Sequence, residues 1–123
     1  MLLLRELLGD YDRAFKGAAT SGAPLLTVVD NVRVFKGSDV RGVPLYTISG
    51  NKLFKGTSVA GVPLATVSGD KLFLGTQVFG APTAVLKGKV AFKGIAGAGA
   101  PLVTVPSGNI KTLFVATYHA LFG

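Results

Sequence analysis

Hydrophobic, polar and turn-forming positions recur along this chain with a period of about 19 residues. Each unit contains a phenylalanine, usually in Phe-Lys-Gly, then a glycine and a proline seven and nine residues later, and most units end on Asn or Asp. The five phenylalanine–proline pairs are Phe15 and Pro24, Phe35 and Pro44, Phe54 and Pro63, Phe73 and Pro82, and Phe92 and Pro101. So many fixed offsets identify a repeat protein, whose units are single supersecondary motifs.

Each unit is predicted to be a β-hairpin of two short strands. In one unit, residues 52–55 form the first strand, 56–61 a turn and 62–67 a second strand rich in strand-forming residues. Ser68-Gly69-Asp70 then makes a tight connection from residues that tolerate positive φ. Proline lacks an N–H donor, so it marks the start or the edge of a strand. A helical interpretation would place proline and several glycines inside every helix, at prohibitive cost.

The two ends of the chain resemble the two halves of one further unit. Residues 3–10 align with 63–70, the second half of a hairpin, while 110–114 resemble a first strand. We therefore expect a single all-β domain of about six hairpins of about 19–20 residues, the sixth split between the termini. The boundaries are a half repeat at 1–10, whole repeats at 11–31, 32–51, 52–70, 71–88 and 89–109, and a half repeat at 110–123.

The split unit has two possible consequences. If its halves pair within one chain, the hairpins close into a pseudo-symmetric ring with few free edges. If the halves pair between chains, strand exchange gives a polymer or a swapped oligomer. We expect closure within the chain. The apolar run 113–122 contains neither Gly nor Pro and is compatible with a long strand or a short helix. In either form we expect it to dock within the protein or onto a neighbour.

The turn motifs Ser49-Gly50-Asn51 and Ser68-Gly69-Asp70, together with the Phe/Gly/Pro phase, cover roughly residues 11–110. In these features the chain resembles small β-hairpin-repeat proteins described as β-flowers. The resemblance implies a fold only, because it carries no catalytic residue to transfer.

The composition changes this picture by indicating association. Over 123 residues the chain is 49% hydrophobic and only 15% charged, with a mean hydropathy of +0.52, which is high for a small isolated domain.

A spanning helix needs about 20 apolar residues, and Gly, Pro, Lys or Asp interrupts every stretch. Membrane-crossing strands of about 9–11 residues would be longer than those expected here. Residues 1–6 lack the features of a signal peptide. We therefore expect a homo-oligomer or a larger protein assembly and no membrane span.

The net charge of +7 adds a second possibility, an anionic partner such as nucleic acid or a glycan. Lysine follows phenylalanine in four units, with Leu74 in the other, and a basic residue stands two positions before phenylalanine in four units. In a ring these positions would form two circles of positive charge, or they would simply keep the hairpin edges hydrated. The possible anionic-partner contacts are Lys16, Lys36, Lys55, Lys93, Arg13, Arg33, Lys52 and Lys71.

Groups for catalysis are scarce. The chain has no cysteine and one histidine, His119, and its carboxylates are scattered at repeat spacing. Serine is present, but no nucleophile elbow or base–nucleophile spacing accompanies it. We therefore expect no enzyme, no metal and no cofactor.

Together these features favour a non-enzymatic structural or assembly protein. A phage virion accessory, such as a capsid decoration, fibre or tail component, is a suitable class, and the virion would then be its location. The alternative is a binding module for an anionic ligand, nucleic acid or glycan, that uses the repeated lysines.

Overall fold

The computed structural model describes residues 11–76, 78–95 and 99–123, which form ten strands and one helix. The strands are β1 (Tyr11–Lys16), β2 (Leu26–Val29), β3 (Arg33–Lys36), β4 (Tyr46–Ser49), β5 (Lys52–Lys55), β6 (Ala65–Ser68), β7 (Lys71–Leu74), β8 (Ala84–Lys87), β9 (Val90–Lys93) and β10 (Val103–Thr104). The helix is α2 (Ile110–Phe122).

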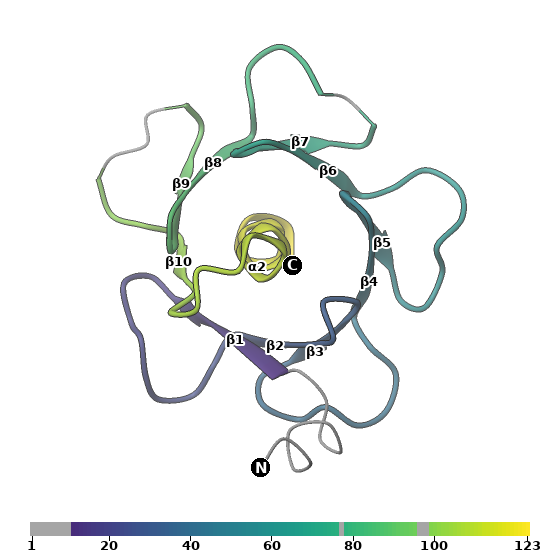
Figure 1. Ribbon diagram of the computed structural model, residues 1–123, viewed down its shortest axis with the longest axis vertical. Helices are drawn as coiled ribbons and strands as arrows, with labels where there is room; N and C mark the ends of the chain where they lie inside the picture. Colours follow the sequence, from purple (N-terminus) through teal and green to yellow (C-terminus); the bar gives the residue numbers. More distant parts are fainter. Residues whose placement is uncertain (1–10, 77, 96–98) are drawn as a thin grey trace.

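The strands form one closed antiparallel barrel (Figure 1). Each strand pairs with its neighbours in the sequence, and the circle closes where β1 pairs with β10, with Phe15 opposite Thr104 and Lys16 opposite Val103. The prediction of an all-β hairpin repeat closed into a ring is confirmed. Closure occurs within one chain, so this ring needs no strand exchange.

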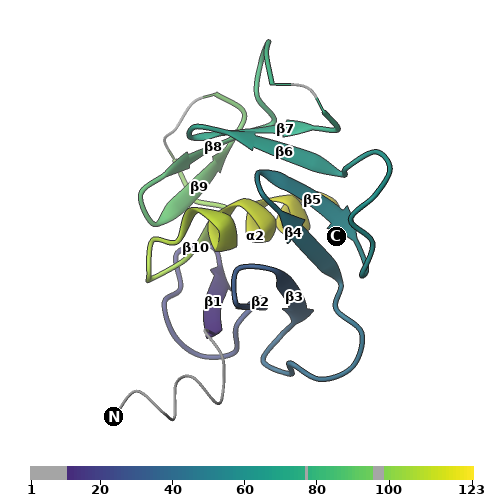
Figure 2. The same ribbon diagram turned by 45° about the vertical axis from the view of Figure 1, so that its right-hand side comes forward.

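The barrel contains five units rather than six, because residues 110–122 are helical and do not supply a strand. Asn109 caps this helix, its side chain accepting a hydrogen bond from the Lys111 N–H. Since β1 already occupies the edge of β10, the segment after β10 has no strand to pair with, and its apolar residues fill the barrel interior instead. Figures 1 and 2 show α2 running through the ring. The predicted half repeat at 110–123 is therefore wrong as a strand, and that at 1–10 lies outside the described residues.

Two kinds of connection alternate around the barrel and define its two ends. Long loops at 17–25, 37–45, 56–64, 75–83 and 94–102 join the strands within each unit and radiate outward (Figure 1). Tight turns join successive units, with positive φ at Asp30, Asn31, Gly50, Gly69 and Gly88, of which the turns at Gly50 and Gly69 match the prediction. We call the two ends of the barrel the loop end and the turn end. Because α2 follows the turn after β10, it begins at the turn end and finishes at the loop end.

The proline of each unit lies in the long loop, just before the strand and not within it, as residues 62–67 illustrate. The residue after proline makes the first ladder hydrogen bond: Leu64 N–H, for example, donates to Leu53 C=O at 2.7 Å. Proline has no N–H to offer, so pairing can begin only at the following amide. Equivalent hydrogen bonds of 2.7–2.8 Å begin the pairing of the second strand in the other four units, with Leu25, Leu45, Thr83 and Leu102 as donors.

Both faces of the barrel wall are buried, which explains why apolar residues are adjacent in the strands. Leu72 faces inward and is fully buried, while the next residue, Phe73, faces outward and is also buried. The inward side chains pack around Leu113, Phe114, Val115 and Ala116 of α2. That helix is buried on all sides along its middle, as expected for a helix inside a protein core.

The repeated phenylalanines lie outside the barrel interior. Phe15, Phe35, Phe54 and Phe73 are buried and Phe92 is partly buried. In four of the units the residue opposite on the paired strand is a threonine, whose hydroxyl donates to the carbonyl of the glycine that begins a long loop. The bonds run from Thr27 to Gly37, Thr47 to Gly56, Thr66 to Gly75 and Thr104 to Gly17, at 2.6–2.7 Å. These bonds hold the loops against the outer wall.

Candidate functional site

The four lysines that follow phenylalanine gather at the loop end, around the last turn of α2. Each ends its strand directly opposite an inward, buried residue: Lys16 opposite Val103, Lys36 opposite Leu26, Lys55 opposite Tyr46, and Lys93 opposite Ala84. Cross-strand partners share a face of the sheet, so these lysines stand on the inner face where the wall ends. We call Lys16, Lys36, Lys55 and Lys93 the lysine rim. Leu74 takes the fifth position, opposite Ala65.

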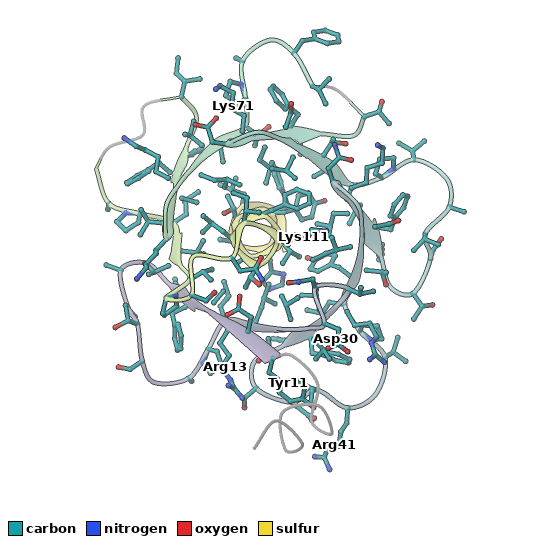
Figure 3. All side chains as sticks on the ribbon, in the orientation of Figure 1. Tyr11, Arg13, Asp30, Arg41, Lys71 and Lys111 are labelled. Carbon is teal, nitrogen blue, oxygen red and sulfur yellow. The ribbon has the colours of Figure 1, made fainter. Side chains whose placement is uncertain are left out.

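The second predicted set, Arg13, Arg33, Lys52 and Lys71, does not join the rim. These residues share the outward face with the phenylalanines two positions later and lie toward the turn end. Figure 3 shows Arg13 and Lys71 outside the ring. Several of them have local polar partners: Lys71 Nζ lies 3.1 Å from Asp70, Arg33 4.0 Å from Asp30, and Lys52 Nζ 3.3 Å from Asn51 Oδ1. The two predicted circles therefore occupy opposite ends and opposite faces.

The rim differs from the outer set in its charge balance. Within residues 11–76, 78–95 and 99–123, no carboxylate forms an ion pair with a rim lysine. The only carboxylate in a long loop is Asp39, and Arg41 of the same loop pairs with it at 3.2 Å and lowers its pKa through backbone and side-chain hydrogen bonds. The end of α2 contributes about half a negative charge through its dipole, and an α-carboxylate at Gly123 would add one more. Four lysines exceed that, so the loop end carries excess positive charge.

A hydrogen-bonded pair of rings lies inside the rim. The Tyr46 hydroxyl, from the inner face of β4, is 2.9 Å from Nδ1 of His119 on α2. Tyr118 meets the Tyr46 ring edge-on, with centroids 5.9 Å apart. Burial, and then the charge of Lys36, lowers the pKa of His119, while burial and then Tyr118 raise the pKa of Tyr46. Both groups are therefore uncharged near neutral pH.

Two hollows open at the loop end beside this pair. The first, about 280 Å³, is lined by Leu45, Tyr46, Lys55, Leu64, Tyr118 and Phe122. The second, about 440 Å³, has Lys16, Leu25, Pro101, Leu102 and His119 among its lining residues. Tyr46 borders one hollow and its partner His119 the other. Each hollow thus combines mostly apolar walls with one rim lysine, a pattern typical of small-molecule sites.

Sequence reasoning identified the rim lysines but missed the hollows and Tyr46. The three tyrosines, Tyr11, Tyr46 and Tyr118, occupy three different repeat phases, so the repeat pattern does not mark any of them. The usable signal was the exception itself: Tyr46 takes an inward position that Leu26, Ala65, Ala84 and Val103 fill in the other units. A single polar aromatic at a position otherwise occupied by aliphatic residues indicates one specialised sector of the ring.

The long loops form a second unusual surface, because they expose apolar side chains. Val43 and Val62, each directly before a proline, are 80% and 82% exposed, and Phe79 and Ile95 are 70% and 71% exposed. We call Val43, Val62, Phe79 and Ile95 the loop tips. Large apolar side chains this exposed on neighbouring loops make the loop tips a candidate interaction surface.

Two further features concern the described residues as a whole. No group of three or more His, Cys, Asp or Glu side chains is placed to hold a metal ion in the part of the chain that the structure describes. Within those same residues, α2 is too short to cross a membrane.

The chain matches no protein-family model, no curated protein and no solved structure. The resemblance to β-flower proteins therefore stays a prediction.

Proposed function

We propose that this protein is a structural component that self-associates, or joins a larger assembly, through its loop tips. The observation that carries the proposal is the 80% and 82% exposure of Val43 and Val62 at equivalent positions of neighbouring loops. Proline follows each valine and restricts the loop backbone, so the loop loses little conformational freedom on docking. Burying one such side chain contributes about 1.5–3 kcal/mol.

The closed barrel directs association to the loops. Among the residues that the structure describes, the ring closed by β1 and β10 leaves no unpaired strand along its circumference onto which another chain could add. The loops also suit contacts between identical copies despite the net charge of +7. Their only charged residues are Asp39 and Arg41, which neutralise each other. A second copy of this chain is therefore the occupant that we propose for the loop tips. A virion is one such assembly, and that assignment stays a prediction.

The test is the mass of the protein in solution at low and high salt, measured by light scattering. We expect an oligomer that persists or tightens in high salt, because excluded salts such as sulfate strengthen apolar burial. The variant Val43→Ser/Val62→Ser should shift it toward the 12.6 kDa monomer. Val32→Ser, which changes a partly exposed valine in a tight turn, is the matched control and should leave the mass unchanged. A wild-type monomer at all salt concentrations would refute self-association.

A second candidate function is recognition of an anion at the lysine rim. Its supporting observation is the excess of lysine at the loop end, where the described carboxylates form no ion pair with the rim. Binding of nucleic acid or an acidic glycan there should weaken steeply from low to moderate salt. Association through the loop tips should not weaken over the same range, so measurements at a series of salt concentrations separate the two functions.

A further inference from the structure

We propose that the larger hollow at the loop end binds a single-chain anionic amphiphile, with its headgroup at Lys16 and His119 and its apolar chain against Leu25, Pro101 and Leu102. The inference deepens the anion-recognition candidate by naming a ligand class. It does not depend on association through the loop tips. The premise is that the apolar walls and the polar groups border one cavity, so they act on one molecule.

The walls favour an apolar body. Leu25 and Leu102 are partly buried and pack against the barrel core, and Pro101 stands beside them in the 440 Å³ hollow. Both leucines donate their N–H groups to the strand ladder, Leu25 to Ala14 and Leu102 to Ala91 at 2.7 Å. Their backbone amides are thus already bonded, and the walls present side chains. Such a surface gains free energy by covering itself with hydrocarbon.

The polar end of the hollow favours a negative charge. Lys16 ends β1 on the inner face and has no carboxylate partner among the described residues. His119 contributes a hydrogen bond and not a charge, because burial and Lys36 lower its pKa. In the proposed complex the Tyr46 hydroxyl donates to Nδ1 of His119, which places the ring proton on Nε2. Nε2–H then donates to the headgroup beside the Lys16 ammonium.

Tyr46 is a positioning residue in this arrangement. In the proposed complex its hydroxyl selects the tautomer of the imidazole by donating to Nδ1, while its own ring packs edge-on against Tyr118. Neither ring contact requires the ligand, so the donor is oriented before the amphiphile arrives. A preorganised donor reduces the ordering cost of binding.

The experiment is calorimetric titration of the full chain with decanoate below its micelle concentration. Decanol, decyltrimethylammonium and acetate serve as the neutral, cationic and short-chain comparisons. We expect saturable binding of decanoate, with the other three at least about tenfold weaker because each lacks either the charge or the chain. Equal binding of decanol, or of the cation, would overturn the proposal and indicate unspecific adsorption to the loop tips.

Variants locate the site. Lys16→Gln should weaken decanoate binding about tenfold, the lower end for a charged hydrogen bond, whereas Lys52→Gln, the same change on the outer wall, should leave it unchanged. Ala120→Phe fills the hollow from an exposed helix position and should abolish binding. Equal losses in Lys16→Gln and Lys52→Gln would refute the location.

His119 is the only histidine, so its ring signals report on this site alone. We expect decanoate to shift the His119 ring resonances in NMR spectra, and Tyr46→Phe to change their tautomer pattern and weaken binding. Ring signals that stay unmoved at saturation would contradict the proposed headgroup position. If an oligonucleotide binds the rim but decanoate does not, anion recognition stands and this inference fails.

Discussion

The turn end and the loop end of the barrel satisfy their polar groups in different ways. At the turn end, Asn109 caps α2 and its amide also donates to Asn31 Oδ1 at 2.6 Å, and Ser107 donates to Asp12 at 2.8 Å. At the loop end, the rim lysines surround the end of α2 beside two hollows, and no carboxylate among the described residues forms an ion pair with them. One end of the same repeat therefore stabilises the fold, whereas the other leaves charged groups at the surface, where we propose that a ligand binds.

Phe114→Ala would remove what both ends share. Phe114 is fully buried at the middle of α2, and its truncation would leave a cavity inside the barrel. We expect the free energy of unfolding to fall by about 3–5 kcal/mol, measured by chemical denaturation. Faster amide hydrogen exchange at only one end, with an unchanged free energy of global unfolding, would show that the two ends are not coupled through the helix.

Asn109→Ala should act on the turn end alone. It removes the helix cap and the bond to Asn31, so we expect a loss of about 1–2 kcal/mol in denaturation experiments. Asn51→Ala is the matched control, because Asn51 sits in an exposed turn and caps no helix. Altered decanoate affinity in folded Asn109→Ala protein would contradict the separation of the two ends.

The loop end should have its own pH dependence. Because the pKa of His119 is lowered on folding, the unfolded chain binds the proton more readily, and stability is lost as the pH falls below about 6.5. The loss ends once the pH is below the folded-state pKa. Thermal unfolding at a series of pH values should show this decline in the wild type, and His119→Gln should remove it. A decline that persists in His119→Gln would assign it to other groups.

The smallest effect is expected in the melting temperatures of two double variants, one with two rim lysines replaced and one with two outer lysines replaced. Lys16→Gln/Lys55→Gln removes two like charges from the loop end of the barrel, so the melting temperature should stay constant or rise slightly. Lys52→Gln/Lys71→Gln removes exposed polar contacts at the turn end, which contribute little to stability. Its melting temperature should stay constant or fall slightly. Reversed signs in thermal melts would show that the rim lysines stabilise the fold.

Much of the turn end was predictable from the sequence, because it is built from local rules. Gly50 and Gly69 indicated positive φ, which the structure has. The two half units at the ends of the chain indicated a closed ring, but the strands that close it are β1 and β10. The start of the helix was misassigned because residues 110–114 match the phase of a first strand, whereas the run 113–122 was compatible with a strand or a helix. Their conformation depends on β1 already being paired with β10, a contact between distant parts of the chain that local pattern does not contain.

The loop-end site was less predictable for the same reason. The rim lysines recur in the sequence, but their inward direction depends on the pairing register. Tyr46 and His119 lie 73 positions apart, and only the passage of α2 through the ring brings them together. The charge of the rim was therefore predictable, whereas the hollows and the oriented imidazole depend on tertiary structure.

The position of α2 inside the ring also constrains the order of folding. Hairpins between successive strands can form early, since their partners are close in the sequence. The helix that fills their interior follows all ten strands, and the seam between β1 and β10 joins residues as far apart as Gly17 and Thr104. During synthesis the strands are therefore made before their core exists, as an open, apolar arc. Correct folding then depends on whether α2 packs inside the arc before the exposed apolar strands associate with another chain.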